Sequence, residues 1–207
     1  MIKVFRVETV DGPWNEKSYQ TMVLDSRVYK TEAERVAYCY KHLWFRGAPI
    51  KDWNPPPLEP YLKSRPEPDI WYYYDGAIAV WKALLSKIPE LETILMQAGQ
   101  LLPQPFKGKE LTICNITECV ECIDAEKSDW IFHPAGKRIT VRRPFFIADK
   151  LPKSTLFKIP QAPMKIFTWE KDQNAEQEFK ACAEKHKLTS VYFIPIWSEE
   201  GGIISNK

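Results

Sequence analysis

A chain of 207 residues is long enough for one large domain or two small ones. With 44% hydrophobic and 27% charged residues, it has the composition of a globular protein that buries a core. The formal net charge of +2 is close to neutral, which argues against the strongly basic surface of many nucleic-acid-binding proteins.

The N-terminal sequence, MIKVFRVETV, lacks the basic head, apolar run and cleavage site of a secretory signal peptide. No stretch reaches the apolar length that a membrane-spanning helix requires. The five cysteines, an odd number, suit free thiols in a reducing compartment. We therefore expect a cytoplasmic protein with no membrane attachment.

The first part of the chain alternates between strand and helix signals. Apolar residues at 2–7 and 19–24 predict two strands. Thr31, with Glu34 three residues later, forms a capping box that predicts a helix over residues 32–45. Residues 46–69 then hold seven of the seventeen prolines, which predicts a polyproline connection laid over the surface, with a proline-recognition ligand as the alternative.

Aromatic and apolar residues follow the proline-rich stretch. The run Ile70-Trp71-Tyr72-Tyr73-Tyr74 suits a strand covered on both faces, although its rings could instead form an exposed binding face. Residues 77–85 are apolar nearly all round, which predicts a central helix from Asp75 to about Ile88. A second helix is predicted from Pro89 to Ala98, and its apolar face consists of Leu91, Ile94, Leu95 and Ala98.

Strand patterns dominate the remaining sequence. Strands are predicted at 101–102 and 111–116, a hairpin over 130–141, and further strands at 156–159, 165–169 and 191–197. A last helix is predicted to begin near Asp172 or Asn174. The pattern predicts an α+β fold, a mixed and largely antiparallel sheet with three or four packed helices. We expect an N-terminal part, residues 1–69, and a main α+β domain, residues 70–207.

Three cysteines have a spacing that occurs in metal proteins. Cys114, Cys119 and Cys122 follow the pattern C-x4-C-x2-C, as do the first three ligands of plant-type iron–sulfur sites. The intervening residues include β-branched side chains and two carboxylates, which disfavour an anionic cluster, and a fourth ligand would have to be Cys182 or Cys39. A metal- or redox-binding protein is thus the alternative function, and buried free cysteines are the expected arrangement.

Residues typical of enzymes are few in this sequence. The three histidines are scattered, and no nucleophile elbow, Walker loop or dinucleotide-binding glycine motif occurs. The acids between Glu118 and Asp129 could pair for catalysis, but acids that solvate a turn are far commoner. We therefore predict no catalytic residue and no cofactor.

The order of several motifs resembles a known family. An acidic turn, Asp124-Ala125-Glu126-Lys127-Ser128, is followed by Leu156-Phe157-Lys158. A helix then ends in Thr189-Ser190 before Phe193-Ile194-Pro195. This order resembles the Imm11 immunity-protein family of bacterial polymorphic toxin systems, formerly a domain of unknown function, over about residues 77–197. Lys158 stands where that family usually has Arg, and Ser190 stands where it usually has Gly.

The resemblance implies a non-catalytic protein that binds and neutralises a cognate toxin protein, and it transfers no catalytic residue. Large rings and strong charge offer candidate anchors for that partner. The predicted partner-binding residues are Glu121, Asp124, Glu126, Trp53, Trp71 and Tyr73.

Overall fold

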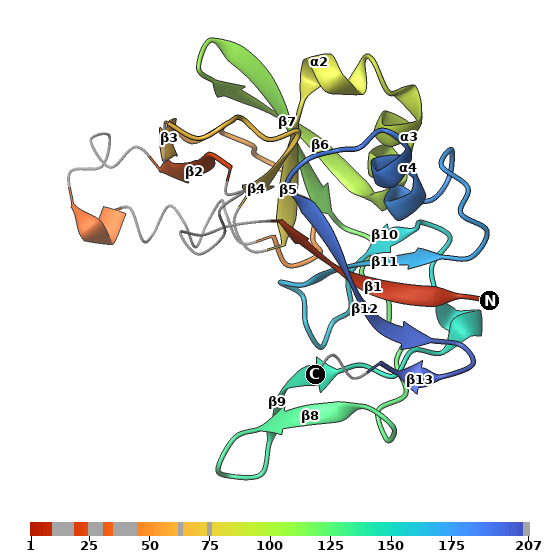
Figure 1. The fold of residues 1–207 in the computed structure, drawn as a ribbon. Coiled ribbons are helices and arrows are strands. Elements are labelled where there is room, and N and C mark those ends of the chain that lie inside the picture. Colours follow the sequence, from red (N-terminus) through yellow and green to blue (C-terminus); the bar gives the residue numbers. More distant parts are fainter. Residues whose placement is uncertain (10–18, 25–30, 35–44, 62–63, 74–75, 205–207) are drawn as a thin grey trace.

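The structure is a computed structural model that describes residues 1–9, 19–24, 31–34, 45–61, 64–73 and 76–204. It confirms the predicted α+β class (Figure 1). All the strand pairs in its sheets are antiparallel, and the strands divide mainly between two sheets rather than forming one.

The first sheet has five strands and combines the N-terminal strand with four C-terminal ones. Strand β1 lies in its centre, between β11 and β12, so residues 3–9 pair with segments more than 150 positions away. The order across the sheet is β10 (Leu156–Phe157), β11 (Ile166–Glu170), β1 (Lys3–Thr9), β12 (Val191–Ser198) and β13 (Gly202–Ile203).

The second sheet has four strands and is built from the middle of the chain. Its order is β4 (Ile70–Tyr73), β5 (Ala77–Trp81), β7 (Lys109–Ile116) and β6 (Gly99–Phe106). Two smaller pairs lie beside these sheets: β2 (Thr21–Leu24) with β3 (Leu58–Tyr61), and β8 (Asp129–Phe132) with β9 (Arg138–Arg143).

The described helices are α2 (Lys82–Leu85), α3 (Pro89–Ala98), α4 (Phe179–Lys185) and the 3₁₀ turn η2 (Ala148–Lys150). The predicted apolar face of α3 is confirmed, because all four of its residues are buried. Glu90 of α3 contacts His186 (2.8 Å) and Lys185 (3.2 Å), which joins α3 to the end of α4. Within the described residues, none of the helices is both long and apolar enough to cross a membrane.

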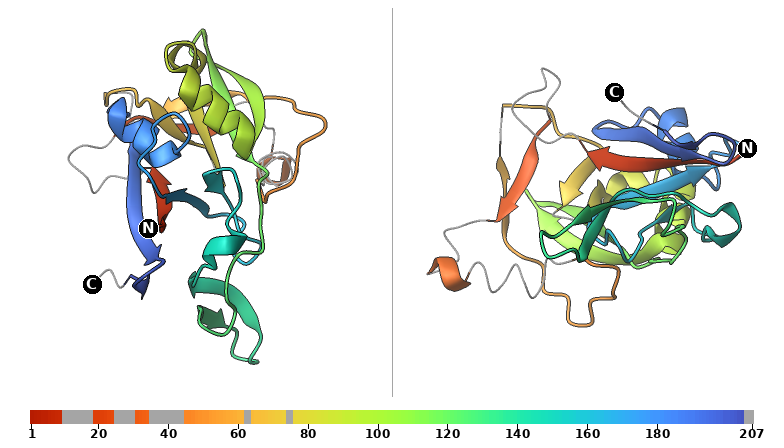
Figure 2. Two further views of the ribbon diagram at one scale, coloured as in Figure 1. Left: turned by 90° about the vertical axis from the view of Figure 1, so that its right-hand side faces the viewer. Right: turned by 90° about the horizontal axis from the view of Figure 1, so that it is seen from below.

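Three buried clusters hold these elements together. The inter-sheet cluster lies between the two sheets and α3 and α4, and it includes Val7, Ile78, Ile94 and Phe179. A second cluster covers the other face of the four-stranded sheet, beneath the proline-rich segment. A third lies on the opposite face of the five-stranded sheet, beneath residues 120–147, which run along that side of the sheet (Figure 2). Each main sheet is therefore buried on both faces.

The prediction of a helix from Asp75 to Ile88 is wrong over most of its length. Residues 77–81 form β5, and only 82–85 are helical. Ile78 belongs to the inter-sheet cluster, whereas Ala79 belongs to the cluster on the opposite face. A strand covered on both faces reads as a continuous apolar run, which is the same signal as a short buried helix.

The last helix begins later than predicted, at Phe179 rather than near Asp172 or Asn174. The Glu178 carboxylate is buried and accepts the backbone N–H groups of Lys171 (2.9 Å), Asp172 (3.0 Å) and Asn174 (3.0 Å). These bonds hold residues 171–174 in a loop that wraps around the carboxylate. At the other predicted helix, the Glu34 N–H donates to Thr31 Oγ1 (3.1 Å), and residues 35–44 lie outside the described part of the chain.

The proline-rich segment is bound to β6. The Ile50 N–H donates to Gln100 Oε1 (2.9 Å), and Trp53 Nε1 donates to the Pro103 carbonyl (2.7 Å). Gln104 is buried in β6 and donates from Nε2 to the Pro56 carbonyl (2.9 Å). Trp53 therefore attaches this segment to the body of the protein. Because β1 is also paired with β11 and β12, the expected N-terminal part contributes a strand to the five-stranded sheet and packs against β6 of the four-stranded sheet.

Replacing Gln104 by Ala tests this attachment. We expect the free energy of unfolding to fall by about 1–3 kcal/mol, because the buried Pro56 carbonyl loses its donor. We also expect a non-specific protease to cleave residues 50–61 faster in this variant than in the wild type, where the segment is protected. Chemical denaturation and limited proteolysis measure both effects. The matched control is Gln97→Ala, which removes an exposed amide from α3; equal cleavage of all three proteins would contradict the prediction.

Candidate partner-binding surface

The acidic turn at residues 124–128 is built around the side chain of Asp124. Its Oδ1 accepts the backbone N–H groups of Glu126 (3.0 Å) and Lys127 (3.2 Å). Its main-chain carbonyl accepts the Ser128 hydroxyl (2.6 Å). An Asp that bonds the backbone two residues onward closes a compact Asx turn. The carboxylate of Asp124 is thus used inside the turn.

Further hydrogen bonds attach this turn to its surroundings. The Asp124 N–H donates to the Phe145 carbonyl (2.8 Å), and the Phe145 N–H donates to Ser128 Oγ (2.9 Å). Trp130 Nε1, on β8, donates to the Ala125 carbonyl (2.9 Å). The turn therefore has a fixed position at the base of the β8–β9 hairpin.

The three predicted acidic anchors differ in how much charge they present to solvent. Hydrogen bonds from the backbone N–H of Lys127 and then Glu126 hold the pKa of Asp124 below its ordinary value. Glu126 is exposed. Glu121 is exposed as well, and it accepts a hydrogen bond from Gln161 Nε2. Glu121 and Glu126 remain candidates to contact a partner, whereas Asp124 has a structural role.

The predicted aromatic anchors are mostly buried. Trp71 and Tyr73 have 0% and 1% of their surface exposed, so they belong to the core and are removed from the candidate surface. Both lie on the face of β4 that packs beneath the proline-rich segment. Trp53 is half-buried, and its ring lies 6.5 Å from that of Tyr73. The continuous run of large apolar residues at 70–73 predicts a strand covered on both faces, but it does not show which distant segments cover them.

The most exposed apolar side chains near this turn lie on the β8–β9 hairpin. Phe132 is 54% exposed and Ile139 is 59% exposed, and Arg138 stacks over the Trp130 ring at 4.5 Å. The hairpin projects from the body at the bottom of Figure 1. The sequence predicts this hairpin but not the exposure of its apolar residues. Their signal was the placement of two large apolar residues beside a Pro-Ala-Gly turn, where solvent exposure is expected.

The hairpin is also connected to Glu121 through Gln161. Thr140 Oγ1 donates to the Gln161 carbonyl (2.9 Å), and Gln161 also bonds Glu121. Arg142 Nη1 on β9 lies 3.8 Å from Asp129 Oδ2 on β8. We call this region the hairpin surface, and it consists of Glu121, Glu126, Asp129, Phe132, Arg138 and Ile139.

The structure does not gather the three cysteines into one site. Cys114 belongs to the inter-sheet cluster, and its thiol contacts the Leu95 carbonyl at 3.7 Å. Cys122 belongs to the cluster beneath residues 120–147, and Cys119 is half-buried. Cys39 lies outside the described residues. Across the part of the chain that the structure describes, no group of three or more His, Cys, Asp or Glu residues could hold a metal ion.

The environment of these thiols also disfavours thiolate chemistry. Burial raises the pKa of Cys114 and of Cys122 to about 12. Burial also raises the pKa of Cys119, and the nearby carboxylates of Glu121 and Glu118 add to this effect. A thiol with a raised pKa stays protonated at neutral pH, and the thiolate is the metal ligand and nucleophile.

Lys158 is a fully buried lysine beside β10. It has 0% of its surface exposed, and its Nζ donates to the Phe45 carbonyl. Its backbone N–H donates to the Glu118 carbonyl (2.8 Å), and its carbonyl accepts the Val120 N–H (2.9 Å). Lys158 is therefore paired with the residues on both sides of Cys119. Burial lowers the pKa of the Lys158 ammonium to about 8. Gly76 (φ 91°) makes room for the ammonium, because a Cβ there would lie 2.9 Å from Nζ.

Comparison with known proteins supplies no family for this chain. No model of a known protein family matches it, and neither does any curated protein sequence. A function for this chain is therefore argued from its own residues and from the resemblance of its motifs.

The buried ammonium of Lys158 predicts an unusual dependence of stability on pH. An unfolded lysine keeps its proton up to about pH 10.5, whereas the folded one releases it near pH 8. Between these values the unfolded chain binds more protons, so the folded state gains stability as pH rises. The full shift corresponds to on the order of 3 kcal/mol.

We expect the free energy of unfolding of the wild type, measured relative to Lys158→Met, to increase from pH 8 to pH 10.5. Urea denaturation at intervals across this range measures the difference. Lys153→Met, which removes an exposed lysine from the preceding loop, is the matched control for the loss of one lysine. Parallel stability curves for the wild type and Lys158→Met would contradict the assignment of a buried charge.

Proposed function

We propose that the protein is a non-catalytic, immunity-type protein of the bacterial cytoplasm that binds and neutralises a cognate toxin protein. The observation that carries this proposal is the hairpin surface. Two large apolar side chains, Phe132 and Ile139, are more than half exposed there, and exposed charged residues such as Arg138 and Glu126 belong to the same surface. Apolar anchors within a polar rim are the arrangement that specific protein interfaces use.

The local geometry of the family-like motifs also supports the proposal. Ser190 stands where the resembling family usually has Gly, and its φ of 64° lies in the left-handed region that Gly adopts without strain. The neighbouring Thr189 hydroxyl donates to Asp69 Oδ2 (2.8 Å), which joins the start of β12 to the start of β4. A Gly-like backbone at this position is what a member of that family would have.

The acidic turn suits a protein that must find its partner quickly. Glu121 and Glu126 are exposed, and the turn between them is held in place by the hydrogen bonds of Asp124. Fixed surface charge accelerates encounter with a partner of opposite charge, and it does so without a large gain in affinity. The proposal therefore expects the toxin to present basic residues to this turn and apolar pockets to the hairpin tip.

Co-purification tests the proposal directly. A gene beside the one for this chain should encode a toxin domain, and the two products should form a stable complex that protects cells expressing the toxin. The proposal is contradicted if no such neighbour exists and no partner is captured from the native host.

Substitutions at the hairpin tip test the surface itself. We expect Phe132→Ser and Ile139→Ser each to weaken toxin binding by roughly tenfold or more, because anchor residues of interfaces typically contribute at least 1–2 kcal/mol. Isothermal titration calorimetry measures the affinity. Met96→Ser is the matched control, since Met96 is 62% exposed on α3. If Met96→Ser weakens binding as much as the hairpin variants, the hairpin is not the contact surface.

Charge reversal tests whether the acidic turn accelerates association with the toxin, as distinct from the contribution of the hairpin to affinity. We expect the double variant Glu121→Lys and Glu126→Lys to slow association with the toxin and to reduce its dependence on salt, because exposed charges act mainly on the association rate. Stopped-flow measurements at several salt concentrations report both quantities. Asp124 is kept, since its carboxylate closes the turn. Glu92→Lys, on α3, is the control, and an unchanged association rate in the double variant would refute steering by the turn.

A further inference from the structure

A second feature of the molecule is a cavity of about 280 Å³ between the five-stranded sheet and β9. Arg6 of β1 lies opposite Phe167 of β11 and opposite Ile194 of β12, so these three side chains project from the same face of the sheet. Val4 lies two residues earlier on that face, where it is fully buried in the cluster beneath residues 120–147. The cavity is therefore the open end of that buried layer.

The lining of this cavity is both cationic and apolar. Of the ten described residues that line it, four carry a positive charge and none is acidic. The four cations are Arg6, Arg142, Arg143 and Lys165. The apolar wall consists of Val141, Pro144, Phe167, Ile194, Ile196 and Ile204.

The nearest carboxylates leave part of this charge uncompensated. Glu8 Oε1 lies 2.6 Å from Arg6 Nε, and Asp129 pairs with Arg142 at 3.8 Å. Lys165, in contrast, has no carboxylate within salt-bridge distance among the described residues. Burial lowers the pKa of Lys165, and the positive charge of Arg6 lowers it further, while Glu8 opposes this effect.

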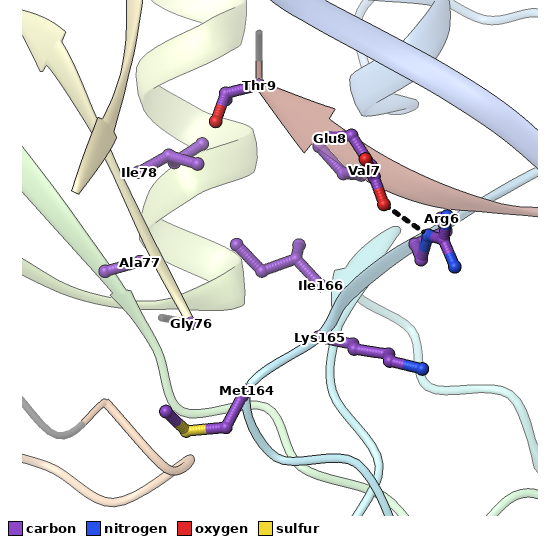
Figure 3. Close-up of a pocket in the computed structure, with 10 residues that line it drawn as sticks. All are labelled: Arg6, Val7, Glu8, Thr9, Gly76, Ala77, Ile78, Met164, Lys165 and Ile166. Atoms are coloured by element: carbon purple, nitrogen blue, oxygen red, sulfur yellow. Dashed lines mark ion pairs between the residues drawn. The ribbon is translucent and has the colours of Figure 1, made fainter. Parts of the chain in front are cut away.

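Arg6 and Lys165 also line a neighbouring cavity of about 360 Å³, which lies between β1, the start of β5 and residues 164–166. In Figure 3 both side chains extend to the same side, away from the apolar side chains of Ile166 and Ile78. They therefore direct their charged ends away from the apolar centre of that cavity. Two like charges held this close, with half-buried stems, form a position where an anion is favoured.

We propose that the cavity lined by Arg6, Lys165, Arg142 and Arg143 binds a carboxylate that carries a short apolar body. The carboxylate contacts Lys165 and the arginines, which bind planar carboxylates well. The apolar body packs on the half-buried side chains of Ile194, Ile196 and Ile204. The volume corresponds to roughly nine water-sized groups, which suits a short-chain acid or one apolar residue with a free carboxylate.

Two sources share this chemistry, a free aliphatic acid and the carboxyl-terminal residue of a polypeptide. Isothermal titration calorimetry of the full chain with sodium octanoate tests the site. Parallel titrations use three other compounds: acetyl-Leu-Leu with a free carboxylate, the same dipeptide with an amidated end, and inorganic phosphate. We expect octanoate or the free-acid dipeptide to bind, and the tighter of the two identifies the source.

Substitutions of Lys165 test whether the carboxylate binds in this cavity. We expect Lys165→Met to weaken binding of the carboxylate at least tenfold, and Lys165→Arg to retain most of it. Lys153→Met, which removes an exposed lysine elsewhere, should leave binding unchanged. Circular dichroism confirms that each variant is folded, and if Lys165→Met does not fold, Arg142→Gln, which removes an exposed cation from the same cavity, is expected to weaken binding and serves as the test.

Three outcomes would overturn the proposal. One is that neither octanoate nor the free-acid dipeptide binds. Another is that phosphate or the amidated dipeptide binds as tightly as the carboxylates. The third is that Lys165→Met weakens binding no more than Lys153→Met does. Because no toxin is used in these measurements, their result is independent of the function proposed above.

Discussion

The inter-sheet cluster is the constraint on which the rest of the structure depends. It takes side chains from β1, β5, β7, α3 and α4, which come from both ends and the middle of the chain. Val7, Ile78 and Ile94 meet there although they lie far apart in sequence. Burial of this apolar area is what offsets the cost of bringing such distant segments together. With one face of each sheet used in this way, the opposite faces are covered by the proline-rich segment and by residues 120–147.

The sequence predicted elements well where one face of an element is buried and the other is exposed. The helix Pro89–Ala98 has buried positions at 91, 94, 95 and 98, which is a clear helical period. The hairpin β8–β9 was recognisable from its turn residues. The prediction failed at residues 77–81, because a strand buried on both faces has no period to detect. It also failed at the start of α4, where a single carboxylate, Glu178, organises a loop through backbone bonds.

Functional residues were harder to predict, because they depend on which distant segments meet. The C-x4-C-x2-C spacing suggested one site, yet Cys114 and Cys122 belong to different clusters, since Cys114 lies in β7 and Cys122 lies in the segment that follows it. The sequence predicted neither the burial of Lys158 nor the place of Arg6 in a cavity. Each lies in an ordinary strand pattern, and only the covering segments decide that Lys158 is buried and that Arg6 lines a cavity.

Strand β9 contributes residues both to the hairpin surface and to the cationic cavity. Val141 is buried in the core, Arg142 and Arg143 line the cavity, and Ile139 lies at the exposed tip. The ion pair between Arg142 and Asp129 is long and exposed, so it contributes at most about 1 kcal/mol. An anion bound to Arg142 would compete with Asp129 and leave that carboxylate free on the hairpin surface. A more negative hairpin surface favours a basic partner, and linkage requires that the partner favour the anion by the same factor. Because that factor would be limited by the strength of the ion pair, the two proposed sites would be coupled weakly and in the same direction.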